Sequence, residues 1–214
     1  MTDLVEYYRR RAGEYEVIYA KPERQAELAR LRRLIPDRLR GRRVLEVACG
    51  TGYWTVPIAR TAAGVLATDI SEEPLRIARA KPLPEARVQF RLADAFAFGA
   101  SLGSFDAAFA GFWWSHVARA RIGEFLASLH ARLLPGASVL LLDNRYVEGS
   151  STPLCGRDAD GNTYQLRRLA DGSETRLLKN FPSEAELRSS LSPHAAAFSY
   201  QALDHYWLVE YRLK

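Results

Sequence analysis

The stretch that decides the fold is LEVACGTGYWT, residues 45–55, where an apolar run ends in two glycines separated by one threonine. Glycine lets the backbone approach a ligand closely and adopts positive φ at little cost. In an open parallel sheet, ligands bind at the carboxyl ends of the strands, near the point where the strand order reverses. We therefore expect this bend to follow the first strand and to border a ligand site.

Short apolar runs alternate with helical patterns along the rest of the chain. Strands are expected over residues 43–48, 65–68, 88–93, 105–113 and 138–144, and helices over 54–63, 72–81 and 121–134. Because these strands are apolar on both faces, they predict a parallel sheet that helices cover on both sides. Two final strands, 197–203 and 206–213, are expected to close the sheet as an antiparallel edge.

The flanking segments extend this core within one expected domain, residues 1–214. Residues 1–40 are expected to form an N-terminal helical cap, and residues 41–146 the ligand-binding core. Residues 147–180 contain several turn signals around an alternating stretch, which predicts an inserted hairpin or lid. Residues 181–214 then supply a closing helix and the closing strands.

Composition limits the classes of function. The 214 residues carry a formal net charge of +5, 48% hydrophobic residues and only two cysteines. No apolar stretch approaches the roughly 20 residues of a membrane helix, and the charged N-terminus lacks a signal core. These features predict a cytoplasmic protein without a membrane partner. The basic balance permits nucleic acid or an anionic small molecule as partner, but an arginine-rich surface requires neither.

The bend lacks the residues that phosphate-binding loops need. A dinucleotide site requires G-x-G-x-x-G, but Thr55 stands at the third glycine position, after Tyr53 and Trp54. No Lys-Ser/Thr pair follows, which excludes the phosphate loop of nucleoside triphosphatases. We therefore expect a nucleoside without phosphates at this bend. Asp69 ends the second strand, where a carboxylate can hold ribose hydroxyls, and Asp94 ends the third.

The motifs at these strand ends resemble those of class I S-adenosylmethionine-dependent methyltransferases over residues 40–145. They are Glu46-x-x-x-Gly50-x-Gly52, Asp69, and Asp94 with Ala95. The resemblance implies a Rossmann-like, doubly wound seven-strand sheet that binds S-adenosylmethionine and releases S-adenosylhomocysteine. It also implies that the glycines face the methionine part, that Asp69 binds the ribose, and that Asp94 reads the adenine with the Ala95 N–H. The expected cofactor-binding residues are Glu46, Gly50, Gly52, Tyr53, Trp54, Asp69, Ile70, Asp94, Ala95 and Phe96.

The acceptor is expected beyond the fourth and fifth strands, where FAGFWWSHV, residues 109–117, ends the fourth. Methyl transfer from a sulfonium is an in-line displacement that mainly requires alignment and exclusion of water. A general base is required only where the acceptor atom carries a proton, and His116 is the candidate for that catalytic role, with helix capping as its alternative. The expected substrate-binding residues are Tyr15, Tyr19, Trp113, Trp114, Asn144, Arg145, Tyr146 and Tyr164.

The insert adds a polar set that could orient an acceptor: Arg157, Asp158, Asn162, Tyr164 and Arg167. The four histidines of the chain are scattered without His-x-x-x-His spacing, so no bound metal is expected.

These features predict S-adenosylmethionine-dependent methyl transfer to a small-molecule acceptor, by N- or O-methylation of a planar or heterocyclic metabolite. The main alternative is an RNA or protein methyltransferase, which the basic charge favours. Against it, the fourth strand lacks the Asp/Asn-Pro-Pro-aromatic motif typical of methyltransferases that act on the amino groups of nucleic-acid bases. The missing third glycine disfavours a NAD-dependent oxidoreductase, and the polar and aromatic rim disfavours a sensor without catalysis. The sequence leaves the oligomeric state open.

Overall fold

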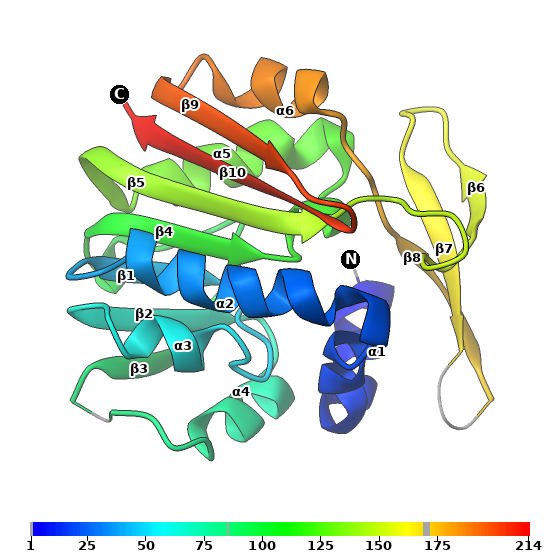
Figure 1. Cartoon of the computed structure of the whole chain (residues 1–214), viewed down its shortest axis with the longest axis horizontal. Helices are drawn as coiled ribbons and strands as arrows, with labels where there is room; N and C mark the ends of the chain where they lie inside the picture. Colours follow the sequence, from blue (N-terminus) through cyan, green and yellow to red (C-terminus); the bar gives the residue numbers. More distant parts are fainter. Residues whose placement is uncertain (1, 85, 169–171) are drawn as a thin grey trace.

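The computed structural model describes residues 2–84, 86–168 and 172–214, without the side chains of residues 2–5 and 15. Its main sheet has seven strands in the order β3-β2-β1-β4-β5-β10-β9 (Figure 1). These strands are β1 (Arg43–Val47), β2 (Gly64–Asp69), β3 (Val88–Leu92), β4 (Phe105–Gly111), β5 (Leu133–Asn144), β9 (Ala195–Ala202) and β10 (Tyr206–Leu213). The first five are parallel, and β10 is antiparallel to both β5 and β9. The predicted doubly wound sheet with an antiparallel final hairpin is confirmed.

The strand order reverses between β1 and β4. The chain passes from β1 outward to β2 and β3, then returns to β4 on the other side of β1 and continues to β5. The loops that follow β1 and β4 therefore leave the sheet in opposite directions and open a crevice at the carboxyl ends of the strands.

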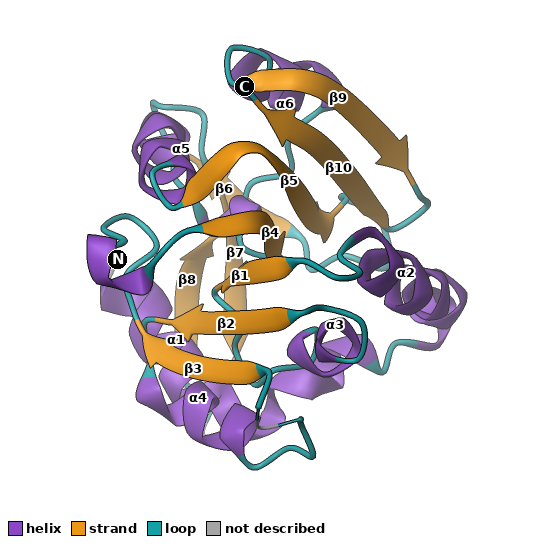
Figure 2. Cartoon of the chain, turned by 90° about the vertical axis from the view of Figure 1, so that its left-hand side faces the viewer, coloured by secondary structure: helices purple, strands orange, loops and turns teal. Residues whose placement is uncertain are grey.

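Helices cover both faces of this sheet. They are α2 (Gln25–Arg38), α3 (Thr55–Ala59), α4 (Glu72–Arg79), α5 (Ile122–His130) and α6 (Glu184–Leu191). Val44 packs in the core that contains residues of α2, α3 and α4, whereas the adjacent Leu45 packs in the core that contains residues of α5 and α6. Figure 2 shows α2 and α3 on one side of the sheet and α5 on the other. Successive apolar residues of one strand thus bury both faces, as a parallel sheet requires.

Further elements lie at the carboxyl ends of the parallel strands (Figure 1). They are α1 (Thr2–Arg11) and a second antiparallel sheet in the order β6-β7-β8, made of β6 (Leu154–Arg157), β7 (Thr163–Arg168) and β8 (Glu174–Leu178). Tyr7 of α1 and Leu177 of β8 form a small buried cluster. The short 3₁₀ segments are η1 (Ala12–Tyr19), η2 (Pro22–Arg24), η3 (Ala100–Leu102), η4 (Trp114–His116) and η5 (Arg119–Arg121). The N-terminal segment and the insert therefore meet above the crevice.

Several local predictions differ from the structure; the helix predicted over 54–63, for example, ends at Ala59. β4 ends at Gly111, before the predicted end at residue 113, because Phe112 adopts a φ of 60° and turns the chain. The helix predicted to residue 134 ends at His130, and β5 already begins at Leu133, which pairs with Phe105. The insert forms three strands rather than one hairpin. Its first strand, β6, is exposed along its whole length, so no apolar alternation marks it in the sequence.

Candidate active site

The bend after β1 forms the base of a first cavity. Ala48, Gly50 and Gly52 have positive φ angles of 50°, 56° and 77°. A Cβ on Gly52 would lie 3.0 Å from the Cβ of Ala78 in α4, so both its conformation and its surroundings favour glycine. Phe112, after β4, is the other non-glycine residue with positive φ among those described. Backbone strain of this kind concentrates at ligand sites, and here it lies on both sides of the crevice.

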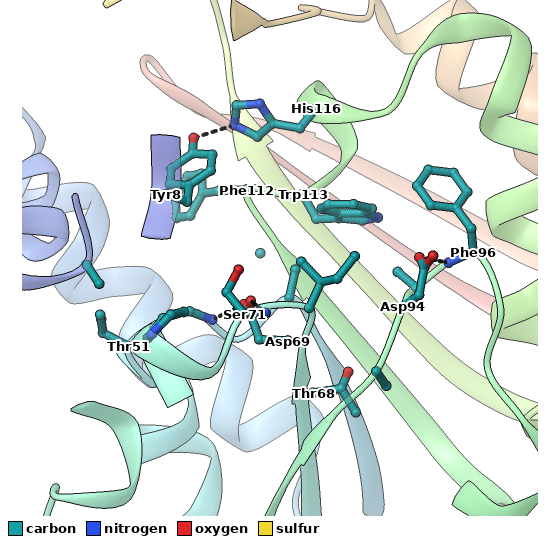
Figure 3. Close-up of a pocket in the computed structure, with 18 residues that line it drawn as sticks. Tyr8, Thr51, Thr68, Asp69, Ser71, Asp94, Phe96, Phe112, Trp113 and His116 are labelled. Atoms are coloured by element: carbon teal, nitrogen blue, oxygen red, sulfur yellow. Dashed lines mark hydrogen bonds between the residues drawn. The ribbon is translucent and has the colours of Figure 1, made fainter. Parts of the chain in front are cut away.

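The first cavity lies against the carboxyl ends of the central strands (Figure 3). Its lining consists of Tyr8, Ala12, Ala48, Gly50, Thr51, Thr68, Asp69, Ile70, Ser71, Pro74, Ala93, Asp94, Ala95, Phe96, Gly111, Phe112, Trp113 and His116. The lining contains six of the ten predicted cofactor-binding residues: Gly50, Asp69, Ile70, Asp94, Ala95 and Phe96. Two aspartates and no lysine or arginine occur among these residues, which suits a nucleoside without phosphates.

Asp69 connects the glycine bend to the end of β2. Its Oδ2 accepts a hydrogen bond from the Gly50 N–H at 2.9 Å, and its Oδ1 accepts one from the Ser71 N–H at 3.0 Å. Burial raises the pKa of this carboxyl, although the backbone N–H groups oppose the rise. Each carboxylate oxygen can accept a further hydrogen bond. Asp69 therefore holds the bend in place and still offers acceptors to a ligand in the cavity.

Asp94 and two aromatic rings border another part of the cavity (Figure 3). Asp94 Oδ1 accepts a hydrogen bond from the Phe96 N–H at 2.9 Å, which fixes the loop after β3. The rings of Phe96 and Trp113 meet edge to face with their centres 5.8 Å apart. The Arg121 guanidinium lies over the Phe96 ring, 3.6 Å from its centre. A flat group can contact these rings while Asp94 offers an acceptor to its edge.

Four predicted cofactor residues are absent from this lining: Glu46, Gly52, Tyr53 and Trp54. Glu46 is 1% exposed, and burial raises its pKa to about 8. Trp54 is buried and packs against Phe109, with ring centres 5.8 Å apart. Tyr53 stacks on Tyr19 with ring centres 3.6 Å apart. The two aromatic residues after the glycines thus pack the start of α3 and the N-terminal segment together instead of lining the cavity.

A second cavity, of about 280 Å³, adjoins the first. Tyr8, Phe112 and His116 line both, so these three residues form the junction. The remaining lining comes from the N-terminal segment, the strand ends and the insert. It consists of Tyr7, Arg11, Val17, Ile18, Tyr19, Lys21, Arg24, Asn144, Ser150, Ser151, Thr152, Gln165, Arg167, Lys179, Phe181 and Tyr206. The predicted acceptor residues Tyr19 and Asn144 are among them.

His116 and Tyr8 make the junction polar. The Nδ1 of His116 lies 2.9 Å from the Leu178 carbonyl, and it donates because a carbonyl oxygen only accepts. The Nε2 of the neutral ring then accepts from the Tyr8 hydroxyl at 2.8 Å (Figure 3). Burial, and then the charge of Lys179, lowers the pKa of His116 well below its usual range. The imidazole is therefore neutral at pH 7, and it does not cap α5, which begins at Ile122.

The two predicted tryptophans point to different places. Trp113 lines the first cavity. Trp114 is 3% exposed and packs edge to face on Phe125 of α5, so it belongs to the core. The side chain of Tyr15 lies outside the described part of the structure.

Arg145 and Tyr146 line neither cavity. The guanidinium of Arg145 donates to the Leu203 carbonyl at the end of β9, and its backbone N–H donates to the His205 carbonyl at 2.8 Å. Tyr146 is 42% exposed. Although both follow β5 directly, the chain turns toward the closing hairpin. Arg145 supports that turn, and the Tyr146 ring packs edge to face on Phe181 with ring centres 5.4 Å apart.

Most of the predicted polar set of the insert closes a turn. Asp158 accepts hydrogen bonds from the Asn162 side chain at 2.9 Å and from the Tyr164 hydroxyl at 2.8 Å. Tyr164 is therefore held by the insert itself and lines neither cavity. Arg167 is the member of the set that reaches the second cavity.

Sequence reasoning missed most of the basic residues of the second cavity: Arg11, Lys21, Arg24 and Lys179. Arg24 and Lys179 are each 6% exposed. No local pattern separates these residues from the many exposed arginines of the chain. Only the fold, which brings the N-terminal segment and the insert together, distinguishes them.

The described residues contain neither a cluster of potential metal ligands nor a membrane-spanning helix. Across 2–84, 86–168 and 172–214, no group of three His, Cys, Asp or Glu side chains is arranged to hold a metal ion. In that part of the chain no helix has the length and apolarity needed to cross a membrane. Cys49 is buried, Cys155 is exposed, and both are free thiols.

Comparison with known proteins agrees with this geometry. Residues 44–136 match a family model described as a methyltransferase domain. A solved DhpI–SAH complex is 31% identical to the chain, with a TM-score of 0.79, and the match covers 98% of this chain and 94% of DhpI. A DhpI–SAM–HEP complex is 30% identical, with a TM-score of 0.81, over 98% of this chain and 95% of that one.

Two curated relatives match over shorter segments. Magnesium-protoporphyrin O-methyltransferase of Rhodobacter capsulatus is 43% identical over 74 residues, which are 34% of this chain and 32% of the relative. Demethylmenaquinone methyltransferase of Clavibacter sepedonicus is 34% identical over 103 residues, 48% of this chain and 41% of the relative. The chain thus matches less than half the length of either curated relative.

Proposed function

The chain belongs to the class I S-adenosylmethionine-dependent methyltransferases, and we propose that it methylates a small molecule held in the second cavity. The observation that carries this proposal is the junction at Tyr8, Phe112 and His116, where the two cavities meet. Methyl transfer needs two sites that share one point, because the acceptor atom must approach the methyl carbon in line with the bond that breaks.

The first cavity suits the cofactor, whose sulfonium supplies an electrophilic methyl group. Asp69 would accept hydrogen bonds from the ribose hydroxyls, and Asp94 with the Ala95 N–H would bind the adenine edge. Gly50 lets the bend approach the methionine part closely. The absence of lysine and arginine from the lining supports this assignment, because a dinucleotide or a triphosphate would need cations or a third glycine there.

The elements above the crevice would exclude water and orient the acceptor. We assign residues 1–40 and 147–180 to this cover and residues 41–146 to the cofactor-binding core of one domain. Tyr8 reaches the junction from α1, and Tyr19 stacks on Tyr53 beside it. For an acceptor atom that carries a proton, the neutral His116 would act through the Tyr8 hydroxyl that it holds.

The acceptor is proposed to be a compact planar or heterocyclic metabolite that is methylated on nitrogen or oxygen. Aromatic side chains of the second cavity, including Tyr19, Phe112 and Phe181, support a flat ligand. The two curated relatives are named for porphyrin and quinone substrates, which are also planar ring systems. Two free cysteines support activity in the cytoplasm.

Calorimetric titration with S-adenosylhomocysteine, NADH and mixed tRNA tests this function. We expect S-adenosylhomocysteine to bind with one site per chain and to raise the Tm, and NADH to do neither. Stabilisation by NADH alone would replace the proposal with an oxidoreductase. Tight tRNA binding with a steep salt dependence would favour an RNA methyltransferase.

A variant at the junction tests the role of His116. His116→Ala should lower turnover roughly 10²-fold, the lower range for acid–base groups, and leave the affinity for S-adenosylhomocysteine within about twofold. Wild-type turnover in His116→Ala would restrict the histidine to packing. A matched loss of cofactor affinity would instead indicate that the substitution disturbs the first cavity.

A further inference from the structure

Lysine and arginine side chains are concentrated in the lining of the second cavity. Five cationic side chains line it, and no Asp or Glu is found among the lining residues that the structure describes. They are Arg11, Lys21, Arg24, Arg167 and Lys179. They come from α1, from the segment before α2, and from the insert, so three separate parts of the chain contribute positive charge to the second cavity.

Arg24 is the most informative of these residues because it is 6% exposed. Its Nη1 donates to the Asn144 Oδ1 at 2.9 Å, and its Nε and Nη2 face the Ser150 hydroxyl at 3.3 and 3.1 Å. Its guanidinium also lies 5.5 Å from the centre of the Tyr206 ring. All these partners are uncharged. Three of its five N–H groups thus face uncharged acceptors, and the buried charge has no carboxylate in direct contact among the described residues.

Neighbouring cations share this situation. Lys21 donates to the Ser150 carbonyl, and Arg167 donates to the Gln165 amide oxygen at 2.7 Å. Among the described residues, Lys179 is the lining cation that forms an ion pair, since Asp143 lies 3.4 Å from its Nζ. The exposed Glu23 interacts with the charges of Lys21 and Arg24, accepts from the Ser150 hydroxyl at 2.8 Å and does not line the cavity. Within the described residues, the lining thus keeps about four positive charges without a buried counter-ion.

These charges act on one another across the cavity. Burial and then Arg24 lower the pKa of Lys21. The pKa of Lys179 is lowered by burial and by Arg167 and Arg24, although Asp143 opposes this. A partly buried cluster of like charges is costly, and an anion at its centre reduces that cost.

We propose that the second cavity recognises its acceptor through an oxyanion group, with Arg24, Lys21 and Arg167 around that group. This inference rests on the proposed function, since it assigns the cavity to the acceptor. Arginine presents a planar fork that matches oxyanions, and such charge-assisted hydrogen bonds are the strongest that side chains form. The excess of about four cations favours a doubly charged group, such as a phosphate ester or a phosphonate, over a carboxylate.

Binding of simple anions to the full chain tests the inference. The protein is first saturated with S-adenosylhomocysteine and then titrated at constant ionic strength with inorganic phosphate, methylphosphonate, acetate and neutral glycerol. We expect phosphate and methylphosphonate to bind, acetate to bind more weakly, and glycerol not to bind. Tighter binding of acetate than of phosphate would retain the oxyanion site and assign it to carboxylates.

Three charge-removing variants give the test its specificity. Arg24→Gln and Arg167→Gln should each weaken phosphate binding roughly tenfold or more, as expected for one charge-assisted hydrogen bond. Arg60→Gln is the matched control, because Arg60 is exposed at the end of α3 and lines neither cavity. It should leave phosphate binding unchanged. Arg24 is buried, so Arg24→Gln could prevent folding; in that case Arg167→Gln still tests whether the cations bind phosphate.

Failure of the proposed oxyanion site and failure of the proposed function give different results in these experiments. Phosphate that binds no better than glycerol, or equally well to wild type and to Arg167→Gln, overturns the oxyanion site while S-adenosylhomocysteine binding upholds the function. Loss of S-adenosylhomocysteine binding by the wild-type protein overturns both. Displacement of phosphate by mixed tRNA would assign the cations to nucleic acid and overturn a small-molecule acceptor.

Discussion

The two cavities differ in charge and in how the chain builds them. The first is acidic and apolar, and most of its lining lies at the ends of neighbouring strands within one continuous stretch of the sequence. The second is basic, and its lining is drawn from α1, η1, the segment before α2, the end of β5 and the insert. The sheet topology alone creates the first cavity. The second exists only because distant segments pack together over the sheet, so its chemistry is independent of the fold class.

The largest expected effect concerns a buried charge in the wall of the second cavity. Lys179→Met leaves Asp143, which is fully buried, without its cation. The free energy of unfolding should fall by about 3–5 kcal/mol, as for other broken buried pairs. Denaturant unfolding of the two proteins measures this difference.

Lys81 supplies the matched control for this prediction. It pairs with the more exposed Glu16, so Lys81→Met should change the free energy of unfolding by only about 0–1 kcal/mol. The double variant Lys179→Met/Asp143→Asn should recover part of the loss, because the buried charge is removed, although the single amide oxygen can replace only one of the two carboxylate oxygens that accept from the Ser115 and Asn144 N–H groups. Equal losses for Lys179→Met and Lys81→Met would remove the contrast between a buried and a surface cation.

How well each cavity can be predicted from the sequence depends on how far apart along the chain its interacting residues lie. Parallel strands that are apolar on both faces, such as 138–144, are visible because the whole signal lies within a few residues. The bounds of β4 and β5 were predicted less well. Phe112 has a positive φ, which the residue type phenylalanine does not predict. The start of β5 depends on pairing with Phe105, which lies far away in the sequence.

The same argument separates the two sites. Asp69 and Asp94 could be predicted because each directly ends a strand, and the topology then brings strand ends together. Arg24 and Lys179 could not, because each is buried against residues far away in the sequence, such as Asn144 for Arg24 and Asp143 for Lys179. Tyr53 and Trp54, also predicted to bind the cofactor, show the opposite relation between sequence and position in space. They stand beside the glycines in sequence, yet helix packing turns their rings away from the cavity lining.

The next largest effect tests the first cavity. Asp69→Ala should weaken S-adenosylhomocysteine binding by about 1.5–3 kcal/mol, the range for losing charged hydrogen bonds. The same substitution also frees the Gly50 and Ser71 N–H groups, so the bend itself loses its anchor. Calorimetric titration measures the affinity. Arg167→Gln, in the other cavity, should leave it unchanged, and unchanged affinity in Asp69→Ala would mean that this carboxylate does not bind the ribose.

A smaller effect distinguishes the glycine bend from an ordinary turn. Gly52 and Gly41 have similar φ angles of 77° and 71°, but a Cβ on Gly41 meets nothing within 4 Å, whereas one on Gly52 meets Ala78. Gly41→Ala should lower the free energy of unfolding by about 1 kcal/mol, the cost of the left-handed conformation, and Gly52→Ala by about 2 kcal/mol. Chemical denaturation measures both. Equal losses would show that α4 adapts to the added methyl group and that its packing does not require glycine.

The smallest effect concerns pH and links the basic cavity to a distant pair of histidines. Burial lowers the pKa of His116 well below its usual range and that of His130 to about 4, with His194 adding to the second shift. In the unfolded chain these groups take up protons near pH 6.5. Because the unfolded state then binds more protons than the folded state, stability is lost as the pH falls below about 6.5.

Replacing either histidine should make this loss shallower. Between pH 6.5 and 4.5, His116→Gln and His130→Gln should each lose about 2–4 °C less in Tm than wild type, the shift that corresponds to roughly 1 kcal/mol in a chain of this size. Phosphate bound in the second cavity would favour the protonated form of His116 and raise its pKa. Added phosphate should therefore flatten the profile of His130→Gln but leave that of His116→Gln unchanged. A phosphate effect of equal size in both variants would place the anion outside the second cavity, because His130 lies with Tyr211 and His194, away from its lining.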